Sequence, residues 1–238
     1  MKKLLSIILA GTMLFSFAAC GEETEEKEKA KNNADTVEDG GAYSDEYEET
    51  QIGSYITFGS YEQDNDTSNG KEDIEWLVLD KQDGKILVVS KYGLDCQDFH
   101  NDMRSEVTWE TCDLRSWLND EFINEAFTDS ELVRVPTVTV TADADPNPET
   151  DVDMGNDTQD KVFVLSVVEM NKYFDSESER ACEITRYAEL KDVSYWWLRT
   201  LCYNDSAYCV EISDGGLTSG APHCAGNVAV RPVMWIEL

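Results

Sequence analysis

The sequence is short of positive charge and has almost no histidine. Its 19 Lys and Arg residues are outnumbered by 49 Asp and Glu residues, giving a formal net charge of −30, and only two histidines are present. A negative field of this size repels phosphate backbones and anionic lipids, which argues against nucleic-acid binding. The two histidines, His100 and His223, lie far apart and no CxxC pair occurs, so the spacing of a structural zinc site is also missing.

The motifs of several enzyme classes are absent as well. The chain contains no G-x-G-x-x-G, no G-x-x-x-x-G-K-[ST], no H-E-x-x-H and no G-x-S-x-G. A Cys/His protease would have to use Cys96 or Cys224, but both histidines lie in turn-like segments, which favours ordinary surface residues. The sequence therefore favours a binding or structural role.

An export signal opens the chain. Two lysines precede an apolar run over residues 4–17, and two alanines lead into Cys20. This is the order of a secretory signal, and the run is shorter than the about 20 apolar residues of a spanning helix. The small residues before Cys20 resemble a lipobox, with Phe17 in place of the usual Leu; the alternative is an ordinary signal peptide followed by a chance cysteine. We predict a signal peptide over 1–19 and lipidation of Cys20, which anchors the protein to the extracytoplasmic face of the cell membrane.

An acidic segment separates this anchor from the rest of the chain. Residues 20–51 hold twelve acidic residues against three lysines, and their apolar content is too low to offset the entropy of ordering them. We predict a stretched, disordered tether. Residues 52–238 form a single globular domain with 14 basic and 37 acidic residues. Such a surface suits cations, basic peptides or neutral sugars, although solubility alone also accounts for it.

Strand patterns mark both ends of this domain. Strands are predicted over 54–58, 74–80 and 85–90, and Asp83-Gly84 joins the last two as a hairpin. Further strands are predicted over 133–141, where Pro136 marks an edge, and over 162–165, 195–199, 207–212 and 228–236, with a turn at 214–216.

Helical patterns lie between these strands. Apolar residues recur at helical spacing from Leu114 to Phe127, with Thr111 or Asp113 as the N-cap, so Trp117 is assigned to the core. Ser166 and Glu169 form a capping box that opens a second helix, and 182–190 is predicted as a third, short one. The order indicates an α+β fold with a mostly antiparallel sheet and two or three helices.

The residues best suited to ligand contact lie near the end of the chain. In a strand, Trp196 and Trp197 face opposite sides, so one ring is predicted to pack in the core and the other to stack on a sugar. Arg199 and Arg231 are unusual in so acidic a domain, and buried ion pairs with carboxylates are the favoured alternative to ligand contact. The predicted ligand-binding set is Trp196, Trp197, Arg199, Asn204, Asp205 and Arg231.

One acidic loop has a pattern that fits calcium. Oxygen-bearing side chains alternate around Gly155 at Asp151, Asp153, Asn156 and Asp157, as in loops that wrap Ca²⁺. The pattern is incomplete, because no glutamate stands at the twelfth position, so a solvated acidic turn is the favoured alternative. Calcium is the one cofactor that the sequence predicts.

Six sequence blocks together resemble a known family. In order they are ITFGSYEQ, IEWLVLD, TWETCDLRSWLNDEF, NDTQDKVFVLS, YWWLRT and VAVRPVMWI. They are similar to an uncharacterised domain of surface lipoproteins from Gram-positive gut bacteria, which has no established activity. The ending also resembles the terminal half of C-type-lectin-like folds, including formylglycine-generating enzymes, and implies such a fold here. The family usually has Ser-Pro-Gly after the WWLR strand, whereas this chain has Thr200-Leu201-Cys202.

The remaining six cysteines are an even number in an exported domain, which predicts disulfides. The unusual Cys202 invites a bond to Cys224, since the two lie eleven residues on either side of Ser213, next to the turn at 214–216. The other predicted pairs are Cys96 with Cys112 and Cys182 with Cys209. Buried, reduced thiols are the alternative.

These features predict a membrane-anchored extracytoplasmic binding module whose ligand is a glycan or a protein. The enzyme alternative follows from the formylglycine-generating resemblance, in which Cys202 and Cys209 would be a copper-binding, oxidising thiol pair. A structural envelope protein is the third alternative.

Overall fold

The computed structural model describes residues 49–102, 106–147, 151–189, 192–203 and 205–238. All of them belong to one compact unit, Asp39–Leu238. The predicted signal peptide, Cys20 and nearly all of the predicted tether lie outside the described residues. The described part contains no helix that is long and apolar enough to cross a membrane.

The first sheet is antiparallel, with the strand order β1-β2-β3-β12-β7. Both residues of the β2–β3 turn have positive φ, 51° at Asp83 and 71° at Gly84, as a two-residue hairpin requires. The predicted hairpin is therefore confirmed. The strands are β1 (Tyr55–Tyr61), β2 (Glu72–Gln82), β3 (Lys85–Ser90), β7 (Val162–Phe163) and β12 (Val233–Glu237).

The second sheet has the order β10-β9-β8-β11-β4 and one parallel pair, β8 with β11. Two of its strands, β4 and β10, were not predicted as strands from the sequence. The strands are β4 (Asp95–Cys96), β8 (Tyr195–Tyr203), β9 (Ser206–Glu211), β10 (Leu217–Pro222) and β11 (Val228–Val230). A separate two-stranded ribbon joins β5 (Val138–Val140) to β6 (Thr158–Asp160).

The predicted strand over 228–236 is two strands in different sheets. β11 ends before Arg231-Pro232 and pairs in the second sheet, whereas β12 begins after them and pairs in the first. Proline has no N–H to give to a ladder, so the pairing breaks there. The segment passes from one sheet to the other within two residues.

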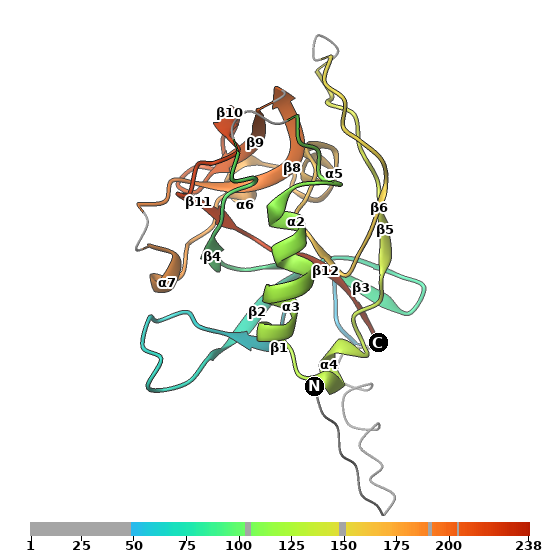
Figure 1. Cartoon of the computed structure of the whole chain (residues 1–238). Coiled ribbons are helices and arrows are strands. Elements are labelled where there is room, and N and C mark those ends of the chain that lie inside the picture. Colours follow the sequence, from blue (N-terminus) through green and yellow to red (C-terminus); the bar gives the residue numbers. More distant parts are fainter. Residues whose placement is uncertain (1–48, 103–105, 148–150, 190–191, 204) are drawn as a thin grey trace, which may run out of the picture. The chain divides into compact units, whose positions relative to one another are not determined.

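The longest helical run lies where the apolar spacing placed it. It comprises α2 (Asp113–Trp117), the π-helical turn η1 (Leu118–Phe122) and α3 (Ile123–Ala126). Its N-cap is Cys112, whose Sγ accepts a hydrogen bond from the Arg115 amide at 3.4 Å, and not Thr111 or Asp113. In Figure 1 this run (green) lies in front of the strands, with the second sheet above it and the first below.

The other helices are short. The capping box of Ser166 and Glu169 is confirmed at α5 (Val167–Tyr173). A second capping box, Thr128 with Glu131, opens α4 (Asp129–Leu132). The turns that follow α4, in which the Arg134 and Val135 amides donate to the carbonyl oxygens of Glu131 and Leu132, occupy the start of the predicted strand over 133–141, which shrinks to β5. The remaining helices are α6 (Glu177–Arg180) and α7 (Arg186–Glu189). The fold is thus α+β and mostly antiparallel, with more and shorter helices than predicted.

Candidate functional site

The strand that carries the WWLR motif does not present a binding surface. Trp196 is 1% exposed and Trp197 is not exposed at all, so the prediction of one exposed ring is wrong. β8 lies in the middle of its sheet and both of its faces are covered. Each indole N–H donates to a carbonyl oxygen, of Arg180 at 3.2 Å for Trp196 and of Gln97 at 2.8 Å for Trp197. Both rings belong to the core.

Arg199 forms buried ion pairs, which the sequence favoured over ligand contact. Its guanidinium forms salt bridges with Glu169 and, at 3.2 Å, with Asp143. It also donates to the carbonyl oxygens of Val164 at 2.9 Å and Thr141 at 3.2 Å. These contacts hold α5 and the start of the 141–157 loop against β8, and they leave little of the guanidinium for a ligand.

Arg231 is buried without a carboxylate partner among the described residues. Its Nε donates to the carbonyl oxygen of Ser90 at 2.8 Å, and its guanidinium lies over the rings of Trp196 and Phe174 at 5.2 and 5.5 Å. Burial lowers the pKa of this guanidinium, and the nearby Cys182 thiol opposes the shift. The predicted ion pair is therefore replaced by carbonyl and π contacts.

Of the other two residues of the predicted ligand set, Asp205 lies between β8 and β9. Asp205 is exposed, and its carboxylate accepts a hydrogen bond from the Ser206 hydroxyl at 3.0 Å. Asn204 lies outside the described residues. The predicted set therefore does not form one ligand-facing surface.

The predicted calcium ligands turn toward different partners. Asp153 accepts from the Gly155 amide at 2.9 Å, and Asp157 accepts from the Ala142 amide at 2.9 Å. The Asn156 amide donates to the Glu110 carboxylate at 2.9 Å, while Asp151 is exposed. Among the described His, Cys, Asp and Glu side chains, three possible metal-ligating atoms come within 4.8 Å of one another only at Glu62, Asp64 and Glu72, outside this loop.

None of the predicted disulfides is formed among the described residues, which include all six cysteines concerned. For Cys202 and Cys224 the reason is the strand order. Cys202 lies on β8, Cys224 follows β10, and β9 runs between those strands. Sγ of Cys202 instead accepts from the Gly220 amide at 3.0 Å.

The other predicted pairs are also held apart by local contacts. Sγ of Cys96 contacts the carbonyl oxygen of Ala188 at 3.5 Å, whereas Cys112 caps α2. Sγ of Cys209 contacts the carbonyl oxygen of Thr218 at 3.8 Å, and Cys182 is not bonded to it.

The thiol pair of the enzyme alternative is protonated at neutral pH. Burial raises the pKa of Cys209 to about 12, and the neighbouring Cys202 adds to the rise. Burial also raises the pKa of Cys202. Copper binds the thiolate form, so binding at this pair would have to displace both protons.

The fold brings together the two histidines that are distant in the sequence. The His100 amide donates to the carbonyl oxygen of His223 at 3.0 Å, and the His223 ring stacks on Phe99 with centroids 4.8 Å apart. His223 is fully buried, and burial lowers its pKa to about 4. His100 faces outward, with Nδ1 3.0 Å from Oδ2 of Asp113.

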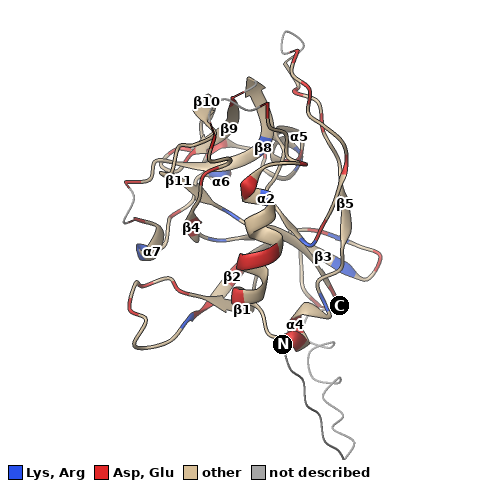
Figure 2. Cartoon of the chain, in the orientation of Figure 1, with Lys and Arg blue, Asp and Glu red and all other residues tan. Residues whose placement is uncertain are grey.

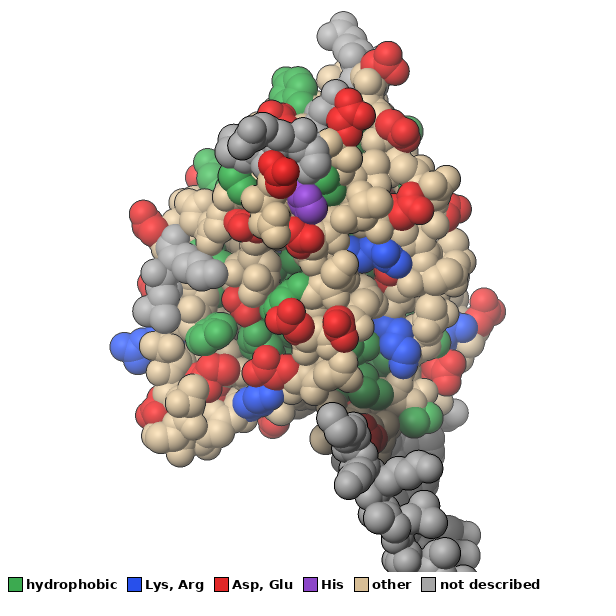
Figure 3. All heavy atoms as spheres, viewed as in Figure 1, with side chains coloured by type: hydrophobic (Ala, Val, Ile, Leu, Met, Phe, Trp, Pro, Cys, Tyr) green, Lys and Arg blue, Asp and Glu red, His purple; other side chains and the backbone are tan. Residues whose placement is uncertain are grey.

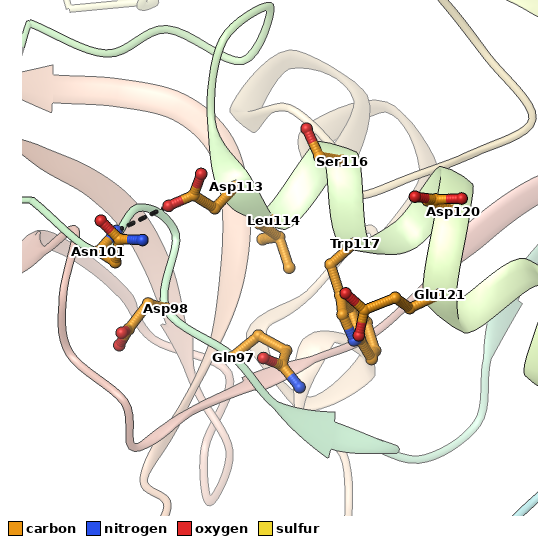
Figure 4. A pocket seen from close by; sticks show the side chains of 9 residues that line it. All are labelled: Gln97, Asp98, Asn101, Asp113, Leu114, Ser116, Trp117, Asp120 and Glu121. Atoms are coloured by element: carbon orange, nitrogen blue, oxygen red, sulfur yellow. Dashed lines mark hydrogen bonds between the residues drawn. The ribbon is translucent and has the colours of Figure 1, made fainter. Parts of the chain in front are cut away.

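A pocket of about 370 Å³ opens beside His100 and Asp113. One wall is the loop that follows β4, and the other is a face of the helical run, as Figure 4 shows. Helical positions 113, 116, 117, 120 and 121 recur at the spacing of one helix face. The residues that line it are Gln97, Asp98, Asn101, Asp113, Leu114, Ser116, Trp117, Asp120 and Glu121.

The pocket is acidic and contains an aromatic ring. Four of its nine lining residues are Asp or Glu, and none is Lys or Arg. Trp117 is half-buried and packs against the hydrophobic core as predicted, with its ring centroid 5.4 Å from that of Phe122, and it also lines the pocket. Acidic side chains are spread over this side of the molecule, and basic ones are few (Figures 2 and 3).

The helix face was the signal that could have revealed this pocket from the sequence. Acidic residues and a serine recur beside Trp117 along this face, at Asp113, Ser116, Asp120 and Glu121. The contribution of Gln97 and Asp98 could not be read in the same way, since they belong to a loop with no periodic pattern.

Comparison with known proteins identifies a matching family. Residues 83–238 match the model of the family described as a domain of unknown function, DUF6273. The matched segment runs from the β2–β3 turn to the C-terminus and includes the pocket, the WWLR strand and both closing strands. No curated protein and no solved structure matches the chain.

Proposed function

This chain belongs to the DUF6273 family, and on that premise we propose that it is a lipid-anchored binding module on the extracytoplasmic face of a cell membrane. The apolar run and the small residues before Cys20 support the anchor. The twelve acidic residues of the tether support a domain held away from an anionic membrane surface. The family of surface lipoproteins from Gram-positive gut bacteria that the sequence resembles fits this location.

The binding site of this module is the acidic pocket between the 97–101 loop and the helix face that begins at Asp113. The observation that carries the proposal is that its polar side chains face an open cavity, while Arg199 and Arg231 are used by the fold. A volume of about 370 Å³ lies within the range of sites that hold small ligands. The pocket therefore replaces the WWLR strand as the place where a glycan or a protein group is bound.

A C-type-lectin-like scaffold is part of the same proposal. Its support is the juxtaposition of the WWLR strand, β8, with the closing segment through Arg231-Pro232. The inference is one of fold analogy and carries no ligand with it.

The test compares two serine substitutions in the mature protein. Ser116→Trp fills the pocket with a bulky ring, and Ser178→Trp places the same ring on exposed α6. Glycan and peptide arrays are probed with the wild type and both variants. We expect at least one ligand that the wild type and Ser178→Trp retain and Ser116→Trp loses. Equal retention by all three proteins would place the binding surface elsewhere.

A further inference from the structure

We propose that residues 223–227, between β10 and β11, form an acid-released latch: the segment covers Phe99 and separates from it when His223 takes up a proton. The proposal concerns a conformational change and goes beyond the proposed binding function, since it holds whether or not the pocket has a ligand.

The latch is attached to the domain through one residue. From 216 to 227, His223 is the only buried residue. Its amide donates to the carbonyl oxygen of Asp205 at 3.0 Å, and its own carbonyl oxygen accepts from the His100 amide at 3.0 Å. These are the only backbone hydrogen bonds that join the latch to distant parts of the described chain, because the amides of residues 225 and 226 donate to carbonyl oxygens at 222 and 224.

The ring of His223 is buried in a way that suits only its neutral form. It stacks on Phe99 with an angle of 24° between the ring planes and the centroids 4.8 Å apart. Neither ring nitrogen forms a hydrogen bond with a described residue. A charged imidazolium is strongly disfavoured in such surroundings, because no acceptor replaces the water that it loses. Protonation therefore favours a state in which the ring is exposed.

The charged groups around the latch do not reverse this preference. Burial is the largest influence on the pKa of His223 and lowers it to about 4, whereas Asp205 raises it and His100 lowers it further. Asp113, at the start of α2, pairs with His100. Asp98, in the loop after β4, lies against Gly226 of the latch.

The surface beneath the latch is held in place without it. The Phe99 carbonyl oxygen accepts from the Leu114 amide at 3.2 Å, and the Trp197 indole N–H donates to the Gln97 carbonyl oxygen at 2.8 Å. The Phe99 ring also packs on Trp197, with centroids 5.5 Å apart. These contacts join the loop after β4 to the helical run and to β8. The latch can therefore leave while the rest of the domain stays folded.

The pH window follows from the two states of His223. The ring has its ordinary pKa of 6.5 when it is exposed and a pKa of about 4 when the latch is closed. Between these values the open state binds a proton that the closed state does not, so the open fraction rises as the pH falls. The increase from pH 7 to pH 5 is about twentyfold.

The test is amide hydrogen exchange of the mature protein, followed by NMR at residues 100 and 223, whose amides close the latch. Amides of β3, in the first sheet, report unfolding of the whole domain. Rates are measured at pH 7 and pH 5, at several urea concentrations below the unfolding transition, and are corrected for the intrinsic effect of pH. The chain has only two histidines, so His223→Phe removes the titration of the latch and His100→Gln is the matched control.

We expect the protection of both amides to fall about twentyfold between pH 7 and pH 5 in the wild type and in His100→Gln. In His223→Phe it should change less than about twofold. At pH 5 the two amides should exchange faster than those of β3 and independently of urea, since a local opening exposes little surface.

Three results would overturn the latch. One is unchanged protection in the wild type between pH 7 and pH 5, and another is an equal fall in His223→Phe. The third is exchange of the two amides at the rate and urea dependence of β3, which would mean that His223 leaves only when the domain unfolds. The wild type alone decides the first and the third, even if His223→Phe does not fold.

Discussion

The buried histidine predicts a pH dependence of stability that can be measured directly. His223 is fully buried against Phe99, and neither of its ring nitrogens has a hydrogen-bond partner among the described residues. Burial is the main cause that lowers its pKa to about 4; Asp205 opposes the shift and His100 adds to it. The neutral ring is therefore built into the folded state.

The sign follows from the two pKa values. The ordinary pKa of 6.5 applies to the unfolded chain, so between about pH 6.5 and pH 4 the unfolded state binds the proton that the folded state does not. Stability rises with pH through this window and is lost as the pH falls. The whole gap corresponds to about 3 kcal/mol, of which about 2 kcal/mol is lost between pH 7 and pH 5.

The assay is urea unfolding of the wild type and His223→Phe at pH 7 and pH 5. The phenyl ring keeps the stack on Phe99 and cannot titrate, and any fixed cost of its larger size is the same at both pH values. Carboxylates that titrate in both proteins cancel in the comparison. We expect the wild type to lose about 2 kcal/mol more than the variant on going from pH 7 to pH 5. A difference below about 0.5 kcal/mol would refute a buried, neutral His223.

Four other perturbations test the core, a turn, the anchor and the thiols. Trp197→Ala removes a fully buried indole and should lower the free energy of unfolding by about 3–5 kcal/mol in urea titrations. Gly215→Ala places a methyl group 1.8 Å from the Glu177 carbonyl oxygen, so its melting temperature should fall further than that of Gly84→Ala, where nothing lies within 4 Å; equal shifts would contradict the close approach. Cys20→Ala should abolish acyl-lipid labelling, and unchanged membrane partitioning would exclude the anchor. Thiol quantification in denaturant without reductant should give six thiols per lipidated chain, whereas fewer would reveal disulfides.

Local signals in the sequence predicted local structure well. The Asp83-Gly84 hairpin and the capping box of Ser166 and Glu169 both appear where their residues stand, because each feature depends on contacts within four residues. The same capping signal at Thr128 and Glu131 was overlooked. The strand predicted over 133–141 began too early, because turns after α4 occupy its first residues, where the Arg134 amide donates to Glu131 and the Val135 amide to Leu132.

Long-range pairing could not be predicted in the same way. The segment 217–222 contains Gly and Pro and has no alternating apolar pattern, yet it forms β10 because β9 offers it a free edge after the 214–216 turn. Cys202 and Cys224 were placed opposite each other by counting outward from the 214–216 turn, whereas β9 begins at Ser206 and Cys202 lies on the preceding strand, β8. The pairing of the His100 and His223 segments is equally non-local, because it depends on how the β4 loop meets the end of β10.

The residues of the WWLR and RP motifs have structural roles in this fold. Arg231 donates to Ser90 on β3 of the first sheet and covers Trp196 on β8 of the second, so one side chain contacts both sheets at the point where the chain passes between them. Pro232 ends the pairing of β11 and lets β12 join the other sheet. A buried guanidinium that donates to the carbonyl oxygens of Ser90 and Arg180 and lies over two aromatic faces is not available to a ligand. The binding site that we propose therefore uses other side chains, those of the helix face beginning at Asp113, which do not connect the two sheets.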